Sequence, residues 1–162
     1  PLAPGAVAQR DGRAALTALA PLGRLDPDAL DGLAALTGEL RLSTRRTLTL
    51  LDLEWSELDG LRTELERLGL VVDRGSGWEG LSACAGLGAC ASARVDVRAA
   101  AVRRAAARSA GDPIEHWSAC GRRGGAPRGA VAVFADEDRV TVEAGGPPCV
   151  TSGVDGALEL LA

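Results

Sequence analysis

Residues 26–53 read DPDALDGLAALTGELRLSTRRTLTLLDL, and this stretch contains the clearest helix and strand patterns of the chain. Asp26 is suited to cap a helix and Pro27 to occupy its first turn, since that position needs no backbone N–H donor. Leucine and alanine then recur at helical spacing until Gly38, which predicts the helix end. After Gly38 the leucines alternate with polar residues on both sides of a corner at 43–45. Alternation of this kind predicts two strands joined by a turn.

The flanking segments extend this pattern in both directions. Residues 14–20 (AALTALA) predict a strand, and residues 1–12 resemble a linker or a cut edge. Ser56, with Asp59 three residues later, predicts a capped second helix that ends at Gly69, followed by a short strand over 70–72. The resulting order β-α-β-β-α-β is typical of a ferredoxin-like α+β unit. We therefore expect a first domain over residues 1–74.

A second α+β domain is expected over residues 75–162, after a linker at 73–80 (DRGSGWEG). Residues 92–110 have high helix propensity, and their arginines at 103, 104 and 108 predict a solvated helix face. A strand over 114–118, a Gly/Arg-rich loop over 121–129 and a hairpin of 130–134 with 139–144 follow. The tip of that hairpin is expected at 136–138, and residues 155–162 predict a weak terminal helix.

Composition narrows the class of protein. The chain has 162 residues, of which 46% are hydrophobic and 25% charged, as in ordinary globular proteins. The net charge of −4, with three Trp and one Phe, disfavours a nucleic-acid partner. No apolar run is long enough to span a membrane and no signal peptide is visible, so we expect a cytoplasmic protein. The first residue is Pro, which suggests a piece of a longer chain.

Four cysteines carry the chemical signal. Cys84 and Cys90 are separated by AGLGA, a gap wider than that of a zinc knuckle and suited to a loop around an iron–sulfur cube. Cys90 would lie at the start of the predicted 92–110 helix, where the helix dipole favours negative charge. Cys120, in another Gly-rich loop, would be a third ligand. Three small buried thiols remain the alternative on spacing alone, and Cys149 is expected to be an unrelated loop or buried thiol.

A cubane needs a fourth ligand, and its natural position is four residues after Cys120. The residue there is Gly124. A C-x5-C pair followed by C-x3-C is similar to the signature of the nitrite and sulfite reductase superfamily. Longer stretches resemble the precorrin-3B synthase family of cobalamin biosynthesis, and the match corresponds to the C-terminal half of such an enzyme. The stretches that carry the resemblance are QRDGRAALTAL (9–19), PLGRL (21–25), RLSTRR (41–46), CASARVDVR (90–98) and HWSACGRRGGAP (116–127).

The resemblance implies an oxygen-dependent monooxygenase that hydroxylates precorrin-3A and forms a lactone. It implies a [4Fe–4S] cluster with Cys84, Cys90 and Cys120 as ligands, with Gly124 where the fourth ligand belongs and Ala126 where His is usual. It also implies a separate non-haem iron as a possible cofactor, NADH acting through an electron-donor protein, and the missing N-terminal half of the enzyme as a partner.

Arg41 and Arg46 match a basic pair of the family and are the expected contacts for an anionic tetrapyrrole. Guanidinium groups bind carboxylates through two parallel hydrogen bonds and stay charged, which suits a substrate with many acetate and propionate groups. His116 is expected to have a structural role, with direct contact to the substrate as the alternative.

Two other functions remain open. A degenerate half-enzyme would bind a tetrapyrrole, or act as a scaffold, without catalysis. Sulfite or nitrite reduction with sirohaem would require a thiolate at position 124 to bridge the cluster and the haem iron, and the residue there is Gly124.

Overall fold

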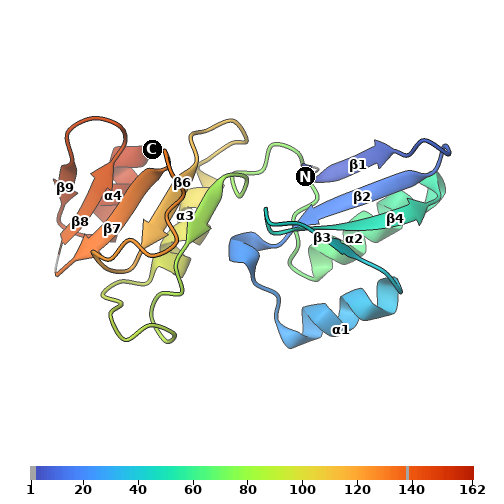
Figure 1. Ribbon diagram of the computed structural model, residues 1–162, viewed down its shortest axis with the longest axis horizontal. Helices are drawn as coiled ribbons and strands as arrows, with labels where there is room; N and C mark the ends of the chain where they lie inside the picture. The colour runs from blue at the N-terminus through green and yellow to red at the C-terminus, as the bar shows by residue number, and fades with distance from the viewer. Residues whose placement is uncertain (1–2, 138) are drawn as a thin grey trace. The chain divides into compact units, whose positions relative to one another are not determined.

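The computed structural model describes residues 3–137 and 139–162, and the chain divides into two compact units, Pro1–Ser76 and Gly77–Ala162. Each unit contains one β-sheet with α-helices packed on it, so the α+β expectation is confirmed (Figure 1). Within the described part of the chain, every helix is too short or too polar to cross a lipid bilayer.

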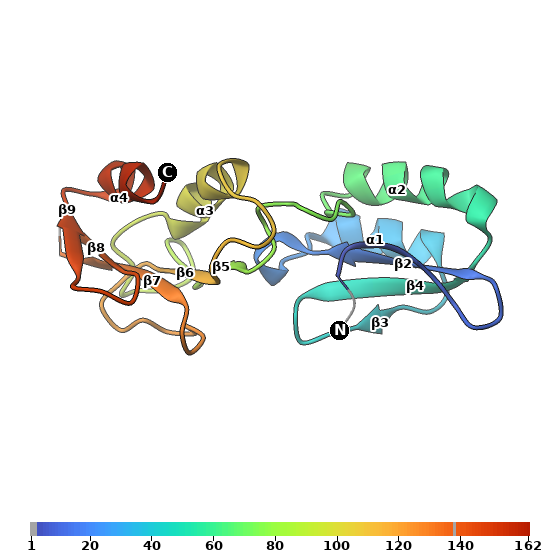
Figure 2. The same ribbon diagram turned by 90° about the horizontal axis from the view of Figure 1, so that it is seen from above.

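The first unit is an antiparallel sheet of four strands in the order β1-β2-β4-β3. Two α-helices lie over one face of this sheet (Figure 2). The strands are β1 (Gly5–Ala8), β2 (Ala14–Leu19), β3 (Arg41–Leu42) and β4 (Thr47–Leu53), and the helices are α1 (Pro27–Leu36) and α2 (Leu58–Arg67). Short 3₁₀ turns precede both helices, at Pro21–Gly23 and Trp55–Glu57.

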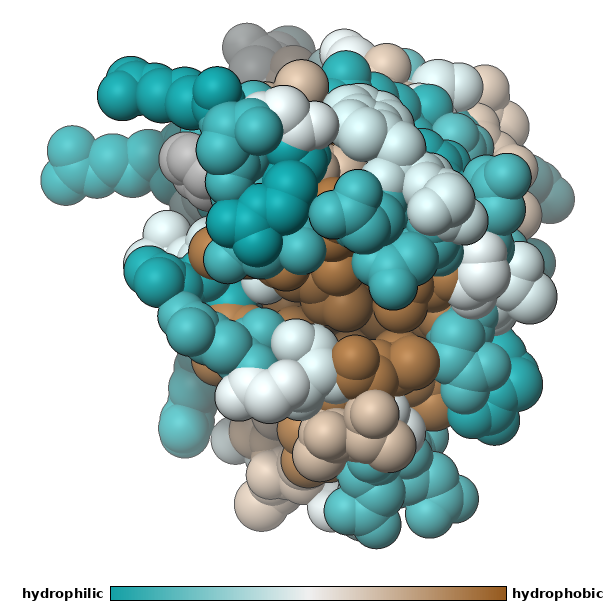
Figure 3. Space-filling model, turned by 90° about the vertical axis from the view of Figure 1, so that its right-hand side faces the viewer, coloured by the Kyte–Doolittle hydropathy of each residue, from teal (hydrophilic) through white to brown (hydrophobic). Residues whose placement is uncertain are grey.

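The expected helix start and the strand–turn–strand that follows are confirmed. The Asp26 carboxylate accepts a hydrogen bond from the Ala29 N–H at 2.8 Å, and Pro27 begins α1. Leucines from both helices and from β2 and β4 form a common core, with Leu16, Leu33 and Leu65 almost fully buried. Figure 3 looks at the molecule from the side of this unit and shows apolar surface framed by hydrophilic residues.

Three expectations for the first unit are wrong in detail. Residues 1–12 are not only a linker, because β1 pairs with β2 through a turn closed by a Gln9 N–H to Arg13 carbonyl bond of 2.8 Å. Ser56 does not cap the second helix. Instead, the Glu57 carboxylate accepts from the Glu54 N–H at 3.0 Å and starts a 3₁₀ turn. The strand expected over 70–72 is a single bridge between Val71 and Leu19.

The second unit has a mixed sheet in the order β5-β6-β7-β8-β9. The first three of these strands run parallel to one another, and the last three are antiparallel. Helices α3 and α4 cover one face of the sheet (Figure 2). The elements are β5 (Leu81–Ala83), α3 (Val97–Ala106), β6 (Glu115–Ser118), β7 (Val131–Asp136), β8 (Arg139–Glu143), β9 (Cys149–Thr151) and α4 (Val154–Leu161).

The helix expected over 92–110 is shorter, because Asp96 caps it. Its carboxylate accepts from the Arg98 and Ala99 N–H groups, both at 3.1 Å, so the chain becomes helical only at Val97. The expectation of a solvated arginine face is wrong for Arg104 and Arg108, which are 7% and 6% exposed. Both guanidinium groups bind the buried Glu115 carboxylate, which removes the cost of burying them unpaired.

The hairpin of β7 and β8 and the terminal helix α4 are confirmed, although Asp138 at the expected tip lies outside the described residues. Cys149 is exposed on the edge strand β9, so a buried thiol is excluded there.

Candidate functional site

Two of the predicted thiols follow neighbouring strands of the second unit. Cys84 comes directly after β5, and Cys120 is the second residue after β6. Since β5 and β6 are parallel, their carboxyl ends lie at the same edge of the sheet. The Cys84 N–H donates to the Trp117 carbonyl at 2.9 Å, and the Ala119 N–H donates to Cys84 Sγ at 3.2 Å. The Cys84 sulfur therefore lies against the backbone that leads into Cys120.

Cys90 belongs to a loop that returns to the same backbone. Its N–H donates to the Gly86 carbonyl at 3.0 Å, and the Arg94 N–H farther along donates to the Ala119 carbonyl at 2.8 Å. Gly86 is required in this loop, because its φ is +68° and a Cβ there would lie 3.0 Å from Val97 Cγ2. Cys90 itself is exposed and lies seven residues before the start of α3. The expectation that Cys90 lies at the start of this helix is therefore wrong, and its stabilisation by the helix dipole stays a prediction.

His116 fixes the loop that contains the fourth position. This histidine is 3% exposed, and its Nε2 donates to the Gly124 carbonyl at 3.0 Å, since a carbonyl can only accept. On the other side of the ring, Nδ1 lies 2.8 Å from Ser82 Oγ of β5. These contacts agree with the structural role expected for His116. A Cβ added to Gly124 would meet no heavy atom within 4 Å, so the backbone there has room for a side chain.

The predicted arginine pair lies on one hairpin of the first unit. Arg41 in β3 is exposed, and its guanidinium forms a surface ion pair with Glu39 at 2.8 Å. Arg46 closes the turn to β4 with φ +63°, and its carbonyl accepts from the Ala20 N–H at 2.9 Å. A Cβ on Gly23 would lie 2.9 Å from Arg46 Cδ, so the glycine leaves room for the arginine side chain. Burial lowers the pKa of Arg46 from its ordinary value.

The similarities to known proteins extend over different parts of the chain. Residues 7–68 match the family model of the nitrite/sulfite reductase ferredoxin-like half domain. The structure of the Mycobacterium tuberculosis NirA protein is similar in fold, with a TM-score of 0.65 and 20% sequence identity over 91% of this chain and 29% of that chain. No curated protein sequence matches the chain.

The match to the nitrite/sulfite reductase half-domain model is confined to residues 7–68 and does not reach the cysteines. Arg41 and Arg46 lie inside the half domain, whereas all four thiols follow residue 68. For the second unit, the likeness to NirA shows the fold alone. The chain spans 29% of the length of the NirA chain.

An iron–sulfur cluster sets a strict requirement on this site, because a cubane takes four thiolates. Among residues 3–137 and 139–162, no three or more His, Cys, Asp or Glu side chains lie close enough together to hold a metal ion. Cys84, Cys90 and Cys120 thus share one edge of the sheet without converging on one point, and position 124 adds no sulfur. As placed, these residues do not fit a complete four-thiolate site.

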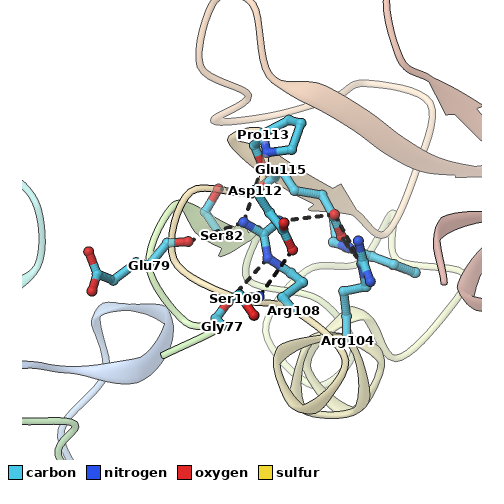
Figure 4. Close-up of polar contacts among 10 residues, drawn as sticks. Gly77, Glu79, Ser82, Arg104, Arg108, Ser109, Asp112, Pro113 and Glu115 are labelled. Atoms are coloured by element: carbon cyan, nitrogen blue, oxygen red, sulfur yellow. Dashed lines mark hydrogen bonds and ion pairs between the residues drawn. The ribbon is translucent and has the colours of Figure 1, made fainter. Parts of the chain in front are cut away.

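Sequence reasoning missed the polar cluster at the opposite edge of the same strands (Figure 4). Glu115 at the start of β6 accepts hydrogen bonds from Arg104, Arg108 and the Trp117 indole, and its side chain is 3% exposed. Arg108 also donates to the carbonyls of Gly77, Glu79 and Pro113. The available signal was an acidic residue inside a segment predicted to be a strand.

Proposed function

We propose that this chain is the C-terminal part of an oxidoreductase of the nitrite/sulfite reductase type that resembles precorrin-3B synthase. In this proposal Cys84, Cys90 and Cys120 are ligands of an iron–sulfur centre, and Arg41 and Arg46 bind carboxylates of a tetrapyrrole. The observation that carries it is the Ala119 N–H aimed at Cys84 Sγ, next to Cys120 in sequence. Hydrogen bonds to cysteine sulfur are a feature of iron–sulfur sites, where they tune the cluster.

The proposed reaction is a monooxygenation of precorrin-3A. One atom of O₂ enters a C–H bond of the tetrapyrrole and the other leaves as water, with two electrons supplied by NADH through a partner protein. An iron–sulfur centre held by Cys84, Cys90 and Cys120 would supply electron transfer when bound, and a separate non-haem iron is the further cofactor that the resemblance implies. Because this chain covers only 29% of a related chain, the N-terminal half of the enzyme is a required partner in this proposal.

Iron loading tests the ligand assignment on the chain itself. We expect anaerobic reconstitution to give bound iron and sulfide with the broad visible absorption of a cluster. Cys84→Ser should remove this absorption, whereas Cys149→Ser, on the exposed edge strand β9, should leave it unchanged. Gly124→Cys should raise the iron content per chain, because position 124 has room for a side chain and completes four thiols.

Two results would contradict the assignment. One is a failure of both the natural chain and Gly124→Cys to bind iron while retaining their fold by circular dichroism. The other is a loss of iron in Cys149→Ser as large as the loss in Cys84→Ser.

A second candidate is a tetrapyrrole-binding or scaffold module without catalysis. It is favoured by the Gly at position 124 and by the three thiols that do not converge. Titration of the iron-free chain with a porphyrin that carries several carboxylates tests it. We expect Arg41→Ala and Arg46→Ala to weaken binding about tenfold each, a size typical of a charge-assisted hydrogen bond, and Arg45→Ala in the same turn to have little effect. Binding that is unchanged in all three variants would contradict it.

Sulfite or nitrite reduction with sirohaem is the third candidate, and Gly124 disfavours it. If Gly124→Cys binds a cluster and then sirohaem while the natural chain binds neither, the ancestral site was of this kind.

A further inference from the structure

We propose that Arg123 is a latch, a side chain that holds the turn 120–123 against β7 and β8 and thereby limits access to the Cys120 thiol. The turn begins a loop whose residues 121–129 read GRRGGAPRG and are all exposed. Glycine gives a backbone wide conformational freedom, so specific contacts must hold a loop of this composition in one place. The latch acts in the iron-free chain, so it goes beyond the function proposed above and does not require that Cys120 binds iron.

The Arg123 side chain contacts two strands of the sheet. Its Nη1 and Nη2 donate to the two Glu143 carboxylate oxygens at 2.7 and 2.8 Å. Its guanidinium carbon lies 3.8 Å from the centre of the Phe134 ring. Glu143 is in register with Ala132, and side chains two positions apart in a strand share a face, so Phe134 and Glu143 lie on the same face of the sheet. The two hydrogen bonds and the stacking fix both the direction and the plane of the guanidinium, which a lysine ammonium could not provide.

The Arg123 backbone has a conformation that needs such support. Its φ is +52°, in the left-handed region that is unfavourable for a residue with a Cβ. In this conformation the Arg123 N–H donates to the Cys120 carbonyl at 3.3 Å and closes a four-residue turn. The contacts of the side chain thus hold the backbone that is bonded to Cys120.

Cys120 differs from two of the other thiols in its exposure. It is half-buried, whereas Cys90 and Cys149 are exposed. We therefore expect reagents to reach Cys120 more readily when the turn opens. The Arg123 and Glu143 side chains are 41% and 31% exposed, and an ion pair in contact with solvent contributes little to global stability. Loss of the latch should therefore change the turn and leave the rest of the fold intact.

Alkylation of the full iron-free chain by iodoacetamide tests the proposal, with the rate at each cysteine measured by peptide mass spectrometry. Arg123→Lys keeps the charge beside Cys120 and removes the paired hydrogen bonds. We expect it to raise the rate at Cys120, relative to the exposed Cys149, about threefold, the size that loss of a partly exposed ion pair allows. The matched control is Arg122→Lys, since Arg122 is the exposed neighbour in the same turn. It should leave the rate unchanged.

Arg123→Asn separates the side chain from the backbone conformation. Asparagine adopts the left-handed region more readily than arginine and has no guanidinium. We expect amide exchange in the turn 120–123 to become about threefold faster in this variant, as for a lost partly exposed ion pair. Exchange that is no faster than in the natural chain would mean that the backbone conformation fixes the turn without the latch.

Three other results would overturn the proposal. They are an unchanged rate at Cys120 in Arg123→Lys, an equal increase in Arg122→Lys, and a loss of the near-UV circular dichroism of the packed fold in Arg123→Lys, because the latch acts on the turn alone. A failure of the natural chain to bind iron would contradict the proposed ligand role of Cys120 and would leave these measurements unaffected.

Discussion

The two edges of the parallel strands in the second unit are built in opposite ways. At the amino-terminal edge, Glu115 and two buried arginines hold α3, β6 and the segment 77–79 together through side chains. At the carboxyl-terminal edge, backbone hydrogen bonds and the His116 ring hold the loops, while Cys90 and residues 121–129 stay exposed. The buried ion pairs are therefore concentrated at one edge, and the three thiols lie on loops carried by the other.

Removal of the charge from Glu115 is expected to give the largest effect. Glu115→Gln would leave Arg104 and Arg108 buried without a carboxylate, and breaking such a pair costs about 3–5 kcal/mol in free energy of unfolding. Urea denaturation followed by Trp fluorescence measures this loss. Glu143→Gln is the control, because its ion pair with Arg123 is partly exposed and should contribute under about 1 kcal/mol. Equal losses in the two variants would remove the contrast between a buried and an exposed carboxylate.

Alanine at two glycines compares the edges directly. A Cβ on Gly77 would lie 2.1 Å from the Ala105 carbonyl oxygen, and the backbone there cannot yield cheaply. We expect Gly77→Ala to lower the free energy of unfolding by about 2 kcal/mol, in the range of overpacked sites. Gly124→Ala meets open space and should change it by under about 0.5 kcal/mol. Thermal unfolding of both variants measures the two changes in stability. A larger loss of stability in Gly124→Ala would show that the carboxyl-terminal edge is the more tightly packed one.

The first unit was the more predictable from sequence, for physical reasons. The cap at Asp26 and the alternating leucines around the 43–45 corner act locally, so their signals lie in adjacent residues. Strand β1 (GAVA) has small residues without contrast between its faces, and its pairing with β2 fixes it. No local pattern could identify it.

The candidate site also has a part that the sequence predicted and a part that it did not. Cysteine spacing placed Cys84 and Cys120 in loops, and the structure puts them after neighbouring parallel strands. The burial of Arg104 and Arg108 could not be predicted from the helix pattern, because alanines lie on all sides of α3 and mark no single buried face. The deciding partner, Glu115, lies 11 and 7 residues away in sequence and becomes a neighbour only when β6 forms.

Ser82→Ala tests how firmly His116 holds the cysteine edge. The variant removes the hydroxyl that lies 2.8 Å from His116 Nδ1, and one such bond contributes about 1 kcal/mol to the free energy of unfolding. We expect a loss of this size, together with faster amide exchange in the loop that contains Gly124, because the ring also holds the Gly124 carbonyl. An unchanged exchange rate there would show that the backbone alone fixes the loop.

The smallest effect on stability is expected when an ion pair at the surface is removed. Its size is the reference against which the loss at the buried Glu115 is compared. On α2, hydrogen bonds from Arg67 lower the pKa of Glu64, and both groups are in solvent. A carboxyl whose folded pKa is lowered adds stability at pH values above its unfolded pKa and loses it as the pH falls through the folded value. Arg67→Ala should therefore raise the pKa of Glu64 toward its ordinary value, as NMR titration of its side chain can measure. It should also reduce the acid-dependent part of the unfolding curve only slightly. A Glu64 pKa that does not move would mean that Arg67 is not its partner in solution. A large loss of stability at neutral pH would show that a surface ion pair can contribute as much free energy of unfolding as a buried one.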